Sequence, residues 1–223
     1  MKGTPSMPEY IWYAAYGSNL HMRRLTYYLE GGTPPGTGHT YPGFRDPTPP
    51  LKTQPLTLPG TIYFAWDSPV WTGGVAFYAT SPRPGWPNGA AARGYLLTPG
   101  QFSDLLTQEM YREPSEDLDF TEVLETGRSQ LGDGRYETLV RATELDGWPV
   151  LTFTSPWDPA TVELHRPSAR YLHMIAGGLS ESHEWSAGHI HTYLSKLPGV
   201  QGNWDAEELR LLVDEALENP AAD

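Results

Sequence analysis

Residues 11–20, with the sequence IWYAAYGSNL, join an apolar run to a short turn. The aromatic and aliphatic residues 11–16 predict a buried strand, and Gly17, Ser18 and Asn19 are typical of a tight turn that ends one. Residues 20–29 can then form a helix. Such a strand–turn–helix junction leaves several backbone N–H groups unpaired, with the positive end of the helix dipole behind them. The junction therefore predicts an anion site, suited to a bound carboxylate or to a developing oxyanion.

The same turn allows two other interpretations. One is ordinary loop chemistry without a ligand. The other makes Ser18 the nucleophile of a hydrolase, on a sharp elbow between strand and helix. That elbow requires small residues two positions before and two positions after the serine, because larger side chains would collide there. Tyr16 and Leu20 hold those positions, and the sequence therefore does not support a serine nucleophile.

A second informative segment, residues 98–113, predicts a helix with an acidic residue on its apolar face. Thr98 is a typical N-cap, and it is followed by Pro99 at the first helical position and by Gln101 three residues after the cap. The helical spacing then places on one face Phe102, Leu105, Leu106, Glu109 and Met110.

Glu109 is the candidate general base or acid on that face. An ionised carboxylate is rarely placed on an apolar face, because removing its charge from water is costly. Burial would raise its pKa toward neutrality, which suits proton transfer. Two alternatives remain open. The end of the helix can turn Glu109 toward water or let it pair with Arg112, and Glu113, one helical turn further on, can be the base instead.

The order of these motifs resembles the γ-glutamylcyclotransferase family. Tyr16-Gly17-Ser18-Asn19-Leu20 is similar to the YGSN-type turn that ends the first strand of that family. Residues 73–76 resemble its next glycine-led strand. Residues 94–97, followed by residues 105–109, resemble the strand and helix that carry its catalytic glutamate.

Two later segments extend the resemblance. Tyr136 precedes an alternating strand, and residues 167–177, which contain Tyr171, resemble the part of the family pattern that brings a tyrosine into the pocket. The chain also departs from the pattern. Phe153 stands where another pocket tyrosine is expected, and Met110 stands where the family has a glycine after its glutamate. A Pro/Gly-rich insertion occupies residues 31–60, and its prolines predict an irregular surface segment rather than a strand. Such a segment is either a lid or disordered, and we favour a lid.

The resemblance implies a reaction and a set of roles. The α-amine of a γ-glutamyl amide or peptide attacks its own γ-carbonyl and releases 5-oxoproline, without a cofactor. Glu109 would move the protons, and the turn from Tyr16 to Leu20 would hold the glutamyl carboxylate or stabilise the oxyanion. Tyr171 and Tyr136 would position the glutamyl group. Two alternatives use the same fold: an acyl-transfer enzyme acting on a γ-glutamyl group carried by a larger biosynthetic intermediate, and a binding module without turnover.

Composition limits the partners. The chain has 223 residues, 27 acidic against 15 basic side chains and a net charge of −12, which argues against a nucleic-acid or anionic-membrane partner. The sequence contains no cysteine, which excludes disulfides and thiol catalysis. We expect a cytoplasmic protein that acts on a small molecule. The oligomeric state is open, and a homodimer is one option.

The predicted fold is α+β: a small mixed β-barrel with surrounding helices, as in γ-glutamylcyclotransferases. We expect a flexible N-terminus at residues 1–9 and a single domain at residues 10–223. The spacing of His183, His189 and His191 does not match a zinc motif, and we expect no metal site. The predicted strands are residues 11–16, 61–65, 73–79, 93–97, 137–145 and 149–154, and Asp146 and Gly147 suit a two-residue hairpin turn between the last two. The predicted helices are residues 20–29, 101–112, 169–176, 183–197 and 206–218, and Gly177 is expected to stop the third.

Overall fold

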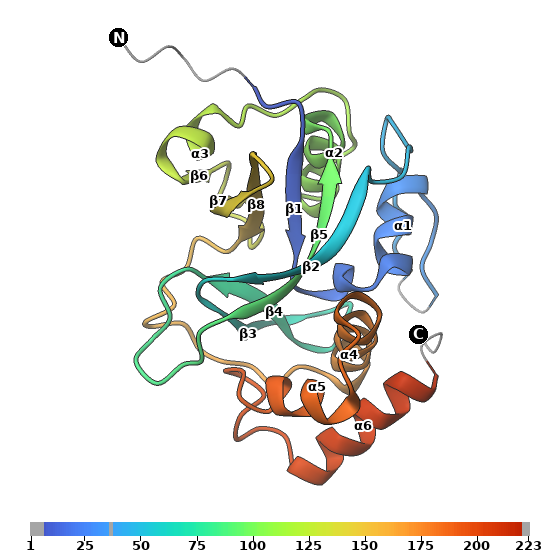
Figure 1. Cartoon of the computed structure of the whole chain (residues 1–223), viewed down its shortest axis with the longest axis vertical. Helices are drawn as coiled ribbons and strands as arrows, with labels where there is room; N and C mark the ends of the chain where they lie inside the picture. Colours follow the sequence, from blue (N-terminus) through green and yellow to red (C-terminus); the bar gives the residue numbers. More distant parts are fainter. Residues whose placement is uncertain (1–6, 36–37, 220–223) are drawn as a thin grey trace.

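The first predicted strand forms and lies inside a mixed sheet (Figure 1). The computed structural model of the chain describes residues 7–35 and 38–219. In that part of the chain the sheet has six strands, in the spatial order β2 (Lys52–Leu58), β5 (Ala90–Leu97), β1 (Ile11–Ala15), β8 (Trp148–Thr154), β7 (Thr138–Leu145) and β6 (Arg128–Gln130). β1 is antiparallel to β5 and parallel to β8.

Both faces of β1 are covered, which explains its continuous apolar sequence. Trp12 and Ala14 pack into a core that also contains residues of β3 (Thr61–Ser68), β4 (Gly73–Ala79), α4 (Ala169–His183), α5 (Ala187–Leu194) and α6 (Ala206–Glu218). Side chains alternate along a strand. Ile11, Tyr13 and Ala15 therefore face the opposite core, with α1 (Met22–Glu30), α2 (Pro99–Glu109) and α3 (Thr121–Thr126). In Figure 1, α4, α5 and α6 lie at the opposite end of the molecule from α3.

The α+β class is confirmed, but the sheet is not a closed barrel. β2 and β6 are its two edges, and β3 and β4 pair only with each other as a separate two-stranded sheet. Where β4 meets β8, the two sheets are joined by a side chain. The Thr154 hydroxyl accepts a hydrogen bond from the Tyr78 N–H (3.1 Å) and donates one to the Tyr78 carbonyl (2.9 Å). A closed barrel would need backbone hydrogen bonds between β4 and β8, and here the Thr154 hydroxyl makes the connection instead.

Part of the predicted irregular insertion is regular. β2 lies within residues 31–60 and pairs with β5 along its whole length. Its outer side is a free edge, so that Pro55, which has no N–H to donate, is tolerated in it. The prediction that this segment contains no strand was therefore wrong, because a partner strand far along the chain supplies the pairing.

The predicted stop at Gly177 was also wrong. α4 continues through Gly177 and Gly178 to His183. A β-carbon at Gly178 would lie 2.6 Å from the Leu20 Cβ, so that glycine here serves the close approach of α4 to the turn after β1. The hairpin predicted at Asp146 and Gly147 is confirmed, since both residues have positive φ and join β7 to β8.

Two further predictions meet the limits of the described residues. The proposed flexible N-terminus, residues 1–9, lies largely outside them, since the description begins at residue 7. Within residues 7–35 and 38–219, no helix has the length and apolar character to cross a bilayer. The same residues contain no group of three histidine or acidic side chains placed to hold a metal ion.

Candidate active site

The turn after β1 forms as a single 3-10 turn, Ser18–Leu20. The Leu20 N–H donates to the Gly17 carbonyl (3.0 Å) and the His21 N–H donates to the Ser18 carbonyl (3.1 Å). These bonds use the last N–H groups of the junction, and the Ser18 backbone is engaged with the Tyr171 hydroxyl.

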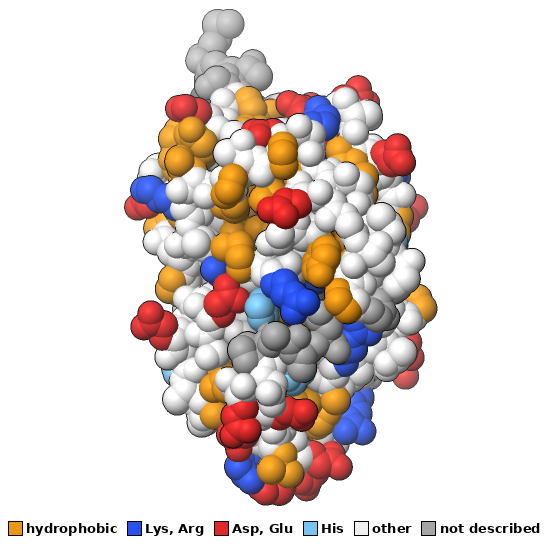
Figure 2. All heavy atoms as spheres, turned by 90° about the vertical axis from the view of Figure 1, so that its right-hand side faces the viewer, with side chains coloured by type: hydrophobic (Ala, Val, Ile, Leu, Met, Phe, Trp, Pro, Cys, Tyr) orange, Lys and Arg blue, Asp and Glu red, His pale blue; other side chains and the backbone are white. Residues whose placement is uncertain are grey.

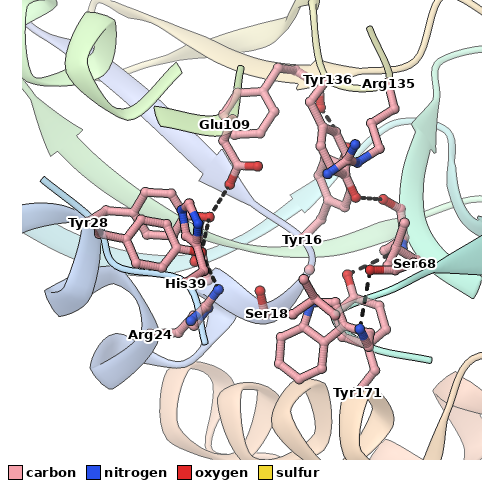
Figure 3. A pocket seen from close by; sticks show the side chains of 18 of the residues that line it. Tyr16, Ser18, Arg24, Tyr28, His39, Ser68, Glu109, Arg135, Tyr136 and Tyr171 are labelled. Atoms are coloured by element: carbon pink, nitrogen blue, oxygen red, sulfur yellow. Dashed lines mark hydrogen bonds between the residues drawn. The ribbon is translucent and has the colours of Figure 1, made fainter. Parts of the chain in front are cut away.

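Most of the turn residues predicted to bind substrate line one pocket (Figure 3). Tyr16, Gly17, Ser18 and Asn19 all contribute to its wall. Leu20 lies elsewhere: it is 1% exposed and packs in the core beside Gly178 of α4. The geometry of the turn directs its side chain inward, and Leu20 is therefore a core residue.

Glu109 is the last residue of α2, and its carboxylate lies in the pocket. The Tyr28 hydroxyl, from α1, donates to its Oε1 at 2.6 Å. Burial raises the pKa of Glu109, while the hydrogen bond from Tyr28 and the positive charges of Arg24 and Arg135 hold it back. The carboxyl group therefore has the raised pKa that its place on an apolar face predicts.

The alternatives for this carboxylate lie outside the pocket. Arg112 forms its ion pair with Glu137 (3.7 Å), and neither residue lines the pocket. Glu113 follows the end of α2 and is exposed. Within the described residues Glu109 is the acidic side chain that lines the pocket.

A line of hydrogen bonds connects Glu109 to a buried arginine. Arg24 Nη2 donates to the Tyr41 hydroxyl, the Tyr41 hydroxyl donates to that of Tyr28 (3.4 Å), and Tyr28 donates to Glu109. Arg24 and Tyr28 are four residues apart and therefore share one face of α1. Tyr41 comes from the Pro/Gly-rich insertion, so that this segment forms part of the pocket wall.

Two predicted positioning residues, Tyr171 and Tyr136, are held by the same backbone unit of β4. The Tyr171 hydroxyl accepts a hydrogen bond from the Ala76 N–H (3.3 Å), and the Tyr136 hydroxyl donates to the Ala76 carbonyl (2.9 Å). Burial raises the pKa of both phenols. Both hydroxyls therefore stay protonated at neutral pH and form a fixed polar wall.

Gly17 is required by a close neighbour. Its φ of −108° is open to any residue, but a β-carbon at this position would lie 2.8 Å from the Tyr171 Oη. The backbone of Ser18 also acts on the pKa of Tyr171 through a hydrogen bond. The phenol of α4 therefore reaches the turn itself, where a ligand was the expected neighbour.

The pocket is electrostatically unlike the surface. Acidic and basic side chains are interspersed on the face shown in Figure 2, and acidic ones gather at the end that carries α6. The pocket contains Arg24 and Arg135 around the single carboxylate of Glu109. Arg135 donates to the Tyr111 hydroxyl (2.5 Å) and stacks 4.4 Å from the Trp66 ring centroid. The arrangement offers a base together with a positive field, which suits a ligand with an anionic group.

Several lining residues were missed by sequence reasoning, namely Arg24, Tyr28, His39, Tyr41, Trp71 and Arg135. For Arg24 and Tyr28 a signal was available. They lie one turn apart on the helix that follows the motif, where a shared face can be read from spacing. His39 and Tyr41 enter from the insertion, and no periodicity in that segment indicates a direction.

Comparisons with known proteins give distant likenesses. No protein-family model matches the sequence. A curated relative, "Histone deacetylase 5" of Arabidopsis thaliana, is 28% identical over 207 residues, which are 83% of this chain and 30% of that protein. The chain thus spans less than a third of that relative's length. Two solved structures, "Gamma-glutamyl cyclotransferase" and the human "uncharacterized protein loc79017", each align with 93% of this chain and 99% of their own, with a TM-score of 0.47 and 15% identity.

Proposed function

We propose that this protein is a γ-glutamylcyclotransferase-like enzyme that releases 5-oxoproline from a γ-glutamyl amide or peptide. The observation that carries the proposal is the placement of Glu109. Its carboxylate is fixed by Tyr28, has a raised pKa and shares one pocket with the turn after β1. A fixed base beside a row of backbone donors is what an intramolecular aminolysis requires.

The first step prepares the nucleophile. Glu109 accepts a proton from the substrate's α-ammonium group, and the free amine attacks the γ-carbonyl carbon of the same molecule. Tyr28 engages Oε1, and within the described residues no hydrogen bond engages Oε2, which is the oxygen left to take the proton. Because the nucleophile is tethered, closure of a five-membered ring gains the advantage of proximity without a cofactor.

The second step releases the amine. The new C–N bond converts the carbonyl oxygen into an oxyanion, which the N–H groups of Gly17 and Asn19 stabilise, while the Ser18 N–H stays with the Tyr171 hydroxyl. The oxyanion collapses as Glu109 gives its proton to the departing nitrogen and the original amide C–N bond breaks. The carboxylate, ionised again, takes the second proton from the ring nitrogen and passes it to the released amine. The products are 5-oxoproline and the amine in its ammonium form, and no water is consumed.

Tyr171 and Tyr136 supply the wall against which the glutamyl group rests. Their hydroxyls are tied to the Ala76 backbone, so their rings cannot swing away. Trp71 lies 4.8 Å from the Tyr171 ring and extends this apolar surface. A wall of fixed rings with protonated hydroxyls favours the methylene chain of a glutamyl group over a fully polar ligand.

The test is incubation of the protein with a panel of γ-glutamyl amides, followed by mass spectrometry for 5-oxoproline. The panel runs from free γ-glutamyl amino acids to γ-glutamyl groups on a larger carrier. We expect release of 5-oxoproline that Glu109→Gln abolishes and Glu113→Gln leaves intact. Turnover of the carrier-bound substrates alone would support the acyl-transfer alternative, and binding without turnover would support a binding module.

A further inference from the structure

Arg24 is a buried cation in the wall of the pocket. The residue is 6% exposed and projects from α1. Its guanidinium carbon lies 5.0 Å from the Tyr41 ring centroid and 5.7 Å from those of Tyr28 and Trp71. Rings at these distances stabilise a desolvated cation, but they do not neutralise its charge.

No anion of the described residues forms an ion pair with this group. Nη2 donates to the Tyr41 hydroxyl, which is uncharged, and Nε is buried without a hydrogen-bond partner. Burial lowers the pKa of Arg24, while the two tyrosines and the more distant Glu109 charge raise it without forming an ion pair. A buried charge without a partner is costly and persists where function requires it.

The other buried arginine of the described chain provides the contrast. Arg93 is 7% exposed, and its Nη1 lies 2.7 Å from Glu181 Oε1. It also donates to the Thr53 hydroxyl (2.9 Å) and to the Leu20 carbonyl (3.3 Å). When this fold buries an arginine for structural reasons, it supplies the acceptors. Arg24, which lines a pocket, has no such set of acceptors.

We propose that Arg24 is the docking point for a carboxylate of the ligand. The inference rests on the proposed function, in which this group is the α-carboxylate of the γ-glutamyl moiety. A guanidinium edge matches the two oxygens of a carboxylate, and its unpartnered Nε is a donor on that edge. With the carboxylate on Arg24, the N–H groups of the turn are left to the oxyanion.

Arg135 is the competing cation in the pocket. It is half-buried, donates to Tyr111, which is 58% exposed, and lies under the Trp66 ring. Since its side chain reaches solvent, water can satisfy its remaining donors, and it needs no ligand. The two arginines therefore form a matched pair for the experiment.

The experiment compares two probes that differ only in charge. 5-Oxoproline carries the carboxylate, and 5-oxoprolinamide replaces it with a neutral amide. We expect isothermal titration calorimetry to show 5-oxoproline binding to the wild type roughly 10- to 100-fold more tightly, the range for hydrogen bonds to charged groups. Arg24→Gln should abolish the preference and Arg24→Lys should keep part of it, while Arg135→Gln should retain most of it.

Folding is controlled by thermal denaturation without ligand. If Arg24 had a structural role, Arg24→Gln would lower the Tm as a change at Arg93 does. We expect a Tm close to that of the wild type, because the replaced charge has no counter-ion to lose. A large loss of Tm in both Arg24 variants would overturn the inference in favour of a structural arginine.

The inference and the proposed function fail separately. Equal affinity for the two probes in the wild type, no measurable binding of 5-oxoproline, or loss of the preference in Arg135→Gln would each overturn the docking role of Arg24. A preference that depends on Arg24, together with no turnover of any γ-glutamyl amide, would keep the carboxylate site and overturn the reaction. Turnover of a γ-glutamyl amide with an unchanged KM in Arg24→Gln would keep the reaction and overturn the carboxylate site.

Discussion

Arg93 and Arg24 are buried to nearly the same degree, yet their surroundings differ completely. Arg93 sits between β5 and α4 with the Glu181 carboxylate beside it, and Glu181 also holds His21 (3.1 Å) and the Met22 N–H (3.3 Å). Arg24 has three aromatic rings and one phenol hydroxyl. The first arrangement is complete and fastens the turn to α4, whereas the second lacks an anion. The difference separates groups that hold the fold from groups that await a ligand.

The carboxylates of the two regions should differ as the arginines do: Glu181 holds the fold and Glu109 serves the reaction. Replacing Glu109 is therefore expected to change the rate more than any other substitution. Glu109→Gln is nearly isosteric, so the fold should survive while proton transfer is lost. The rate should fall roughly 10²–10⁴-fold, which is the usual contribution of general acid–base catalysis. Steady-state release of 5-oxoproline measures it, with the exposed Glu113→Gln as the matched control. Normal turnover by a folded Glu109→Gln protein would remove Glu109 from the mechanism.

Replacing each arginine should affect the free energy of unfolding differently. Arg93→Met removes one member of an ion pair and takes a donor away from Glu181 Oε1, the Leu20 carbonyl and the Thr53 hydroxyl. Because Glu181 is 35% exposed, the cost should lie below that of a fully buried pair, at about 1–3 kcal/mol of unfolding free energy. Urea denaturation measures it. Arg24→Met should lower the same quantity by less than Arg93→Met does, since no ion pair is broken and the hydrogen bond lost is the one to the Tyr41 hydroxyl. Equal losses in the two variants would erase the distinction.

The prediction from sequence worked where the deciding contacts are local. The Thr98 cap with Gln101 forms a complete capping box. β4 begins and ends at the predicted residues, and the turn at Asp146 and Gly147 forms as predicted. Each of these depends on a few consecutive residues, whose propensities agree with their surroundings.

The prediction failed where the deciding contact comes from elsewhere in the chain. β2 needs β5 as its partner, and α4 passes through two glycines because Leu20 packs there. The barrel was expected from the family resemblance, but the link from β8 to β4 is a threonine hydroxyl. Of the site, the turn and Glu109 were named from sequence. Arg24 was not, because its missing counter-ion is visible only once the neighbouring side chains are in place.

A smaller effect concerns the contact between the turn and α4. Gly17→Ala places a methyl group 2.8 Å from the Tyr171 Oη, and the resulting crowding should cost about 1–2 kcal/mol of stability together with substrate affinity. Tyr171→Phe removes the hydroxyl and makes room. A double-mutant cycle of unfolding free energies should therefore show that the second change relieves part of the first. Strict additivity would mean that this contact is not what requires glycine.

The smallest expected effect is a shift in pH dependence. Glu109 must be ionised to accept a proton, so kcat/KM should rise with pH through its pKa, which lies above the ordinary glutamate value. The Tyr28 hydrogen bond lowers that pKa, and Tyr28→Phe should therefore move the acidic limb to higher pH. A limb that stays in place or moves to lower pH would show that Tyr28 does not stabilise the ionised carboxylate.

The raised pKa of Glu109 should also make stability fall with rising pH, whereas activity rises. A group whose pKa is higher in the folded state binds more protons there, so its contribution to stability falls as pH rises from the unfolded pKa to the folded one. The unfolding free energy of the wild type, relative to that of Glu109→Gln, should therefore decrease across this interval. Denaturant titrations at a series of pH values measure it, and an increase would contradict the effect of burial on Glu109.

The central claim is that the substrate's own α-amine is the nucleophile. The most direct measurement is mass spectrometry of the products from a γ-glutamyl amide and from the same amide with an acetylated α-amine. The account predicts 5-oxoproline from the free amine and no turnover of the blocked substrate, because an acetylated nitrogen is no longer nucleophilic. Release of N-acetylglutamate from the blocked substrate would show that water is the nucleophile and would contradict the account.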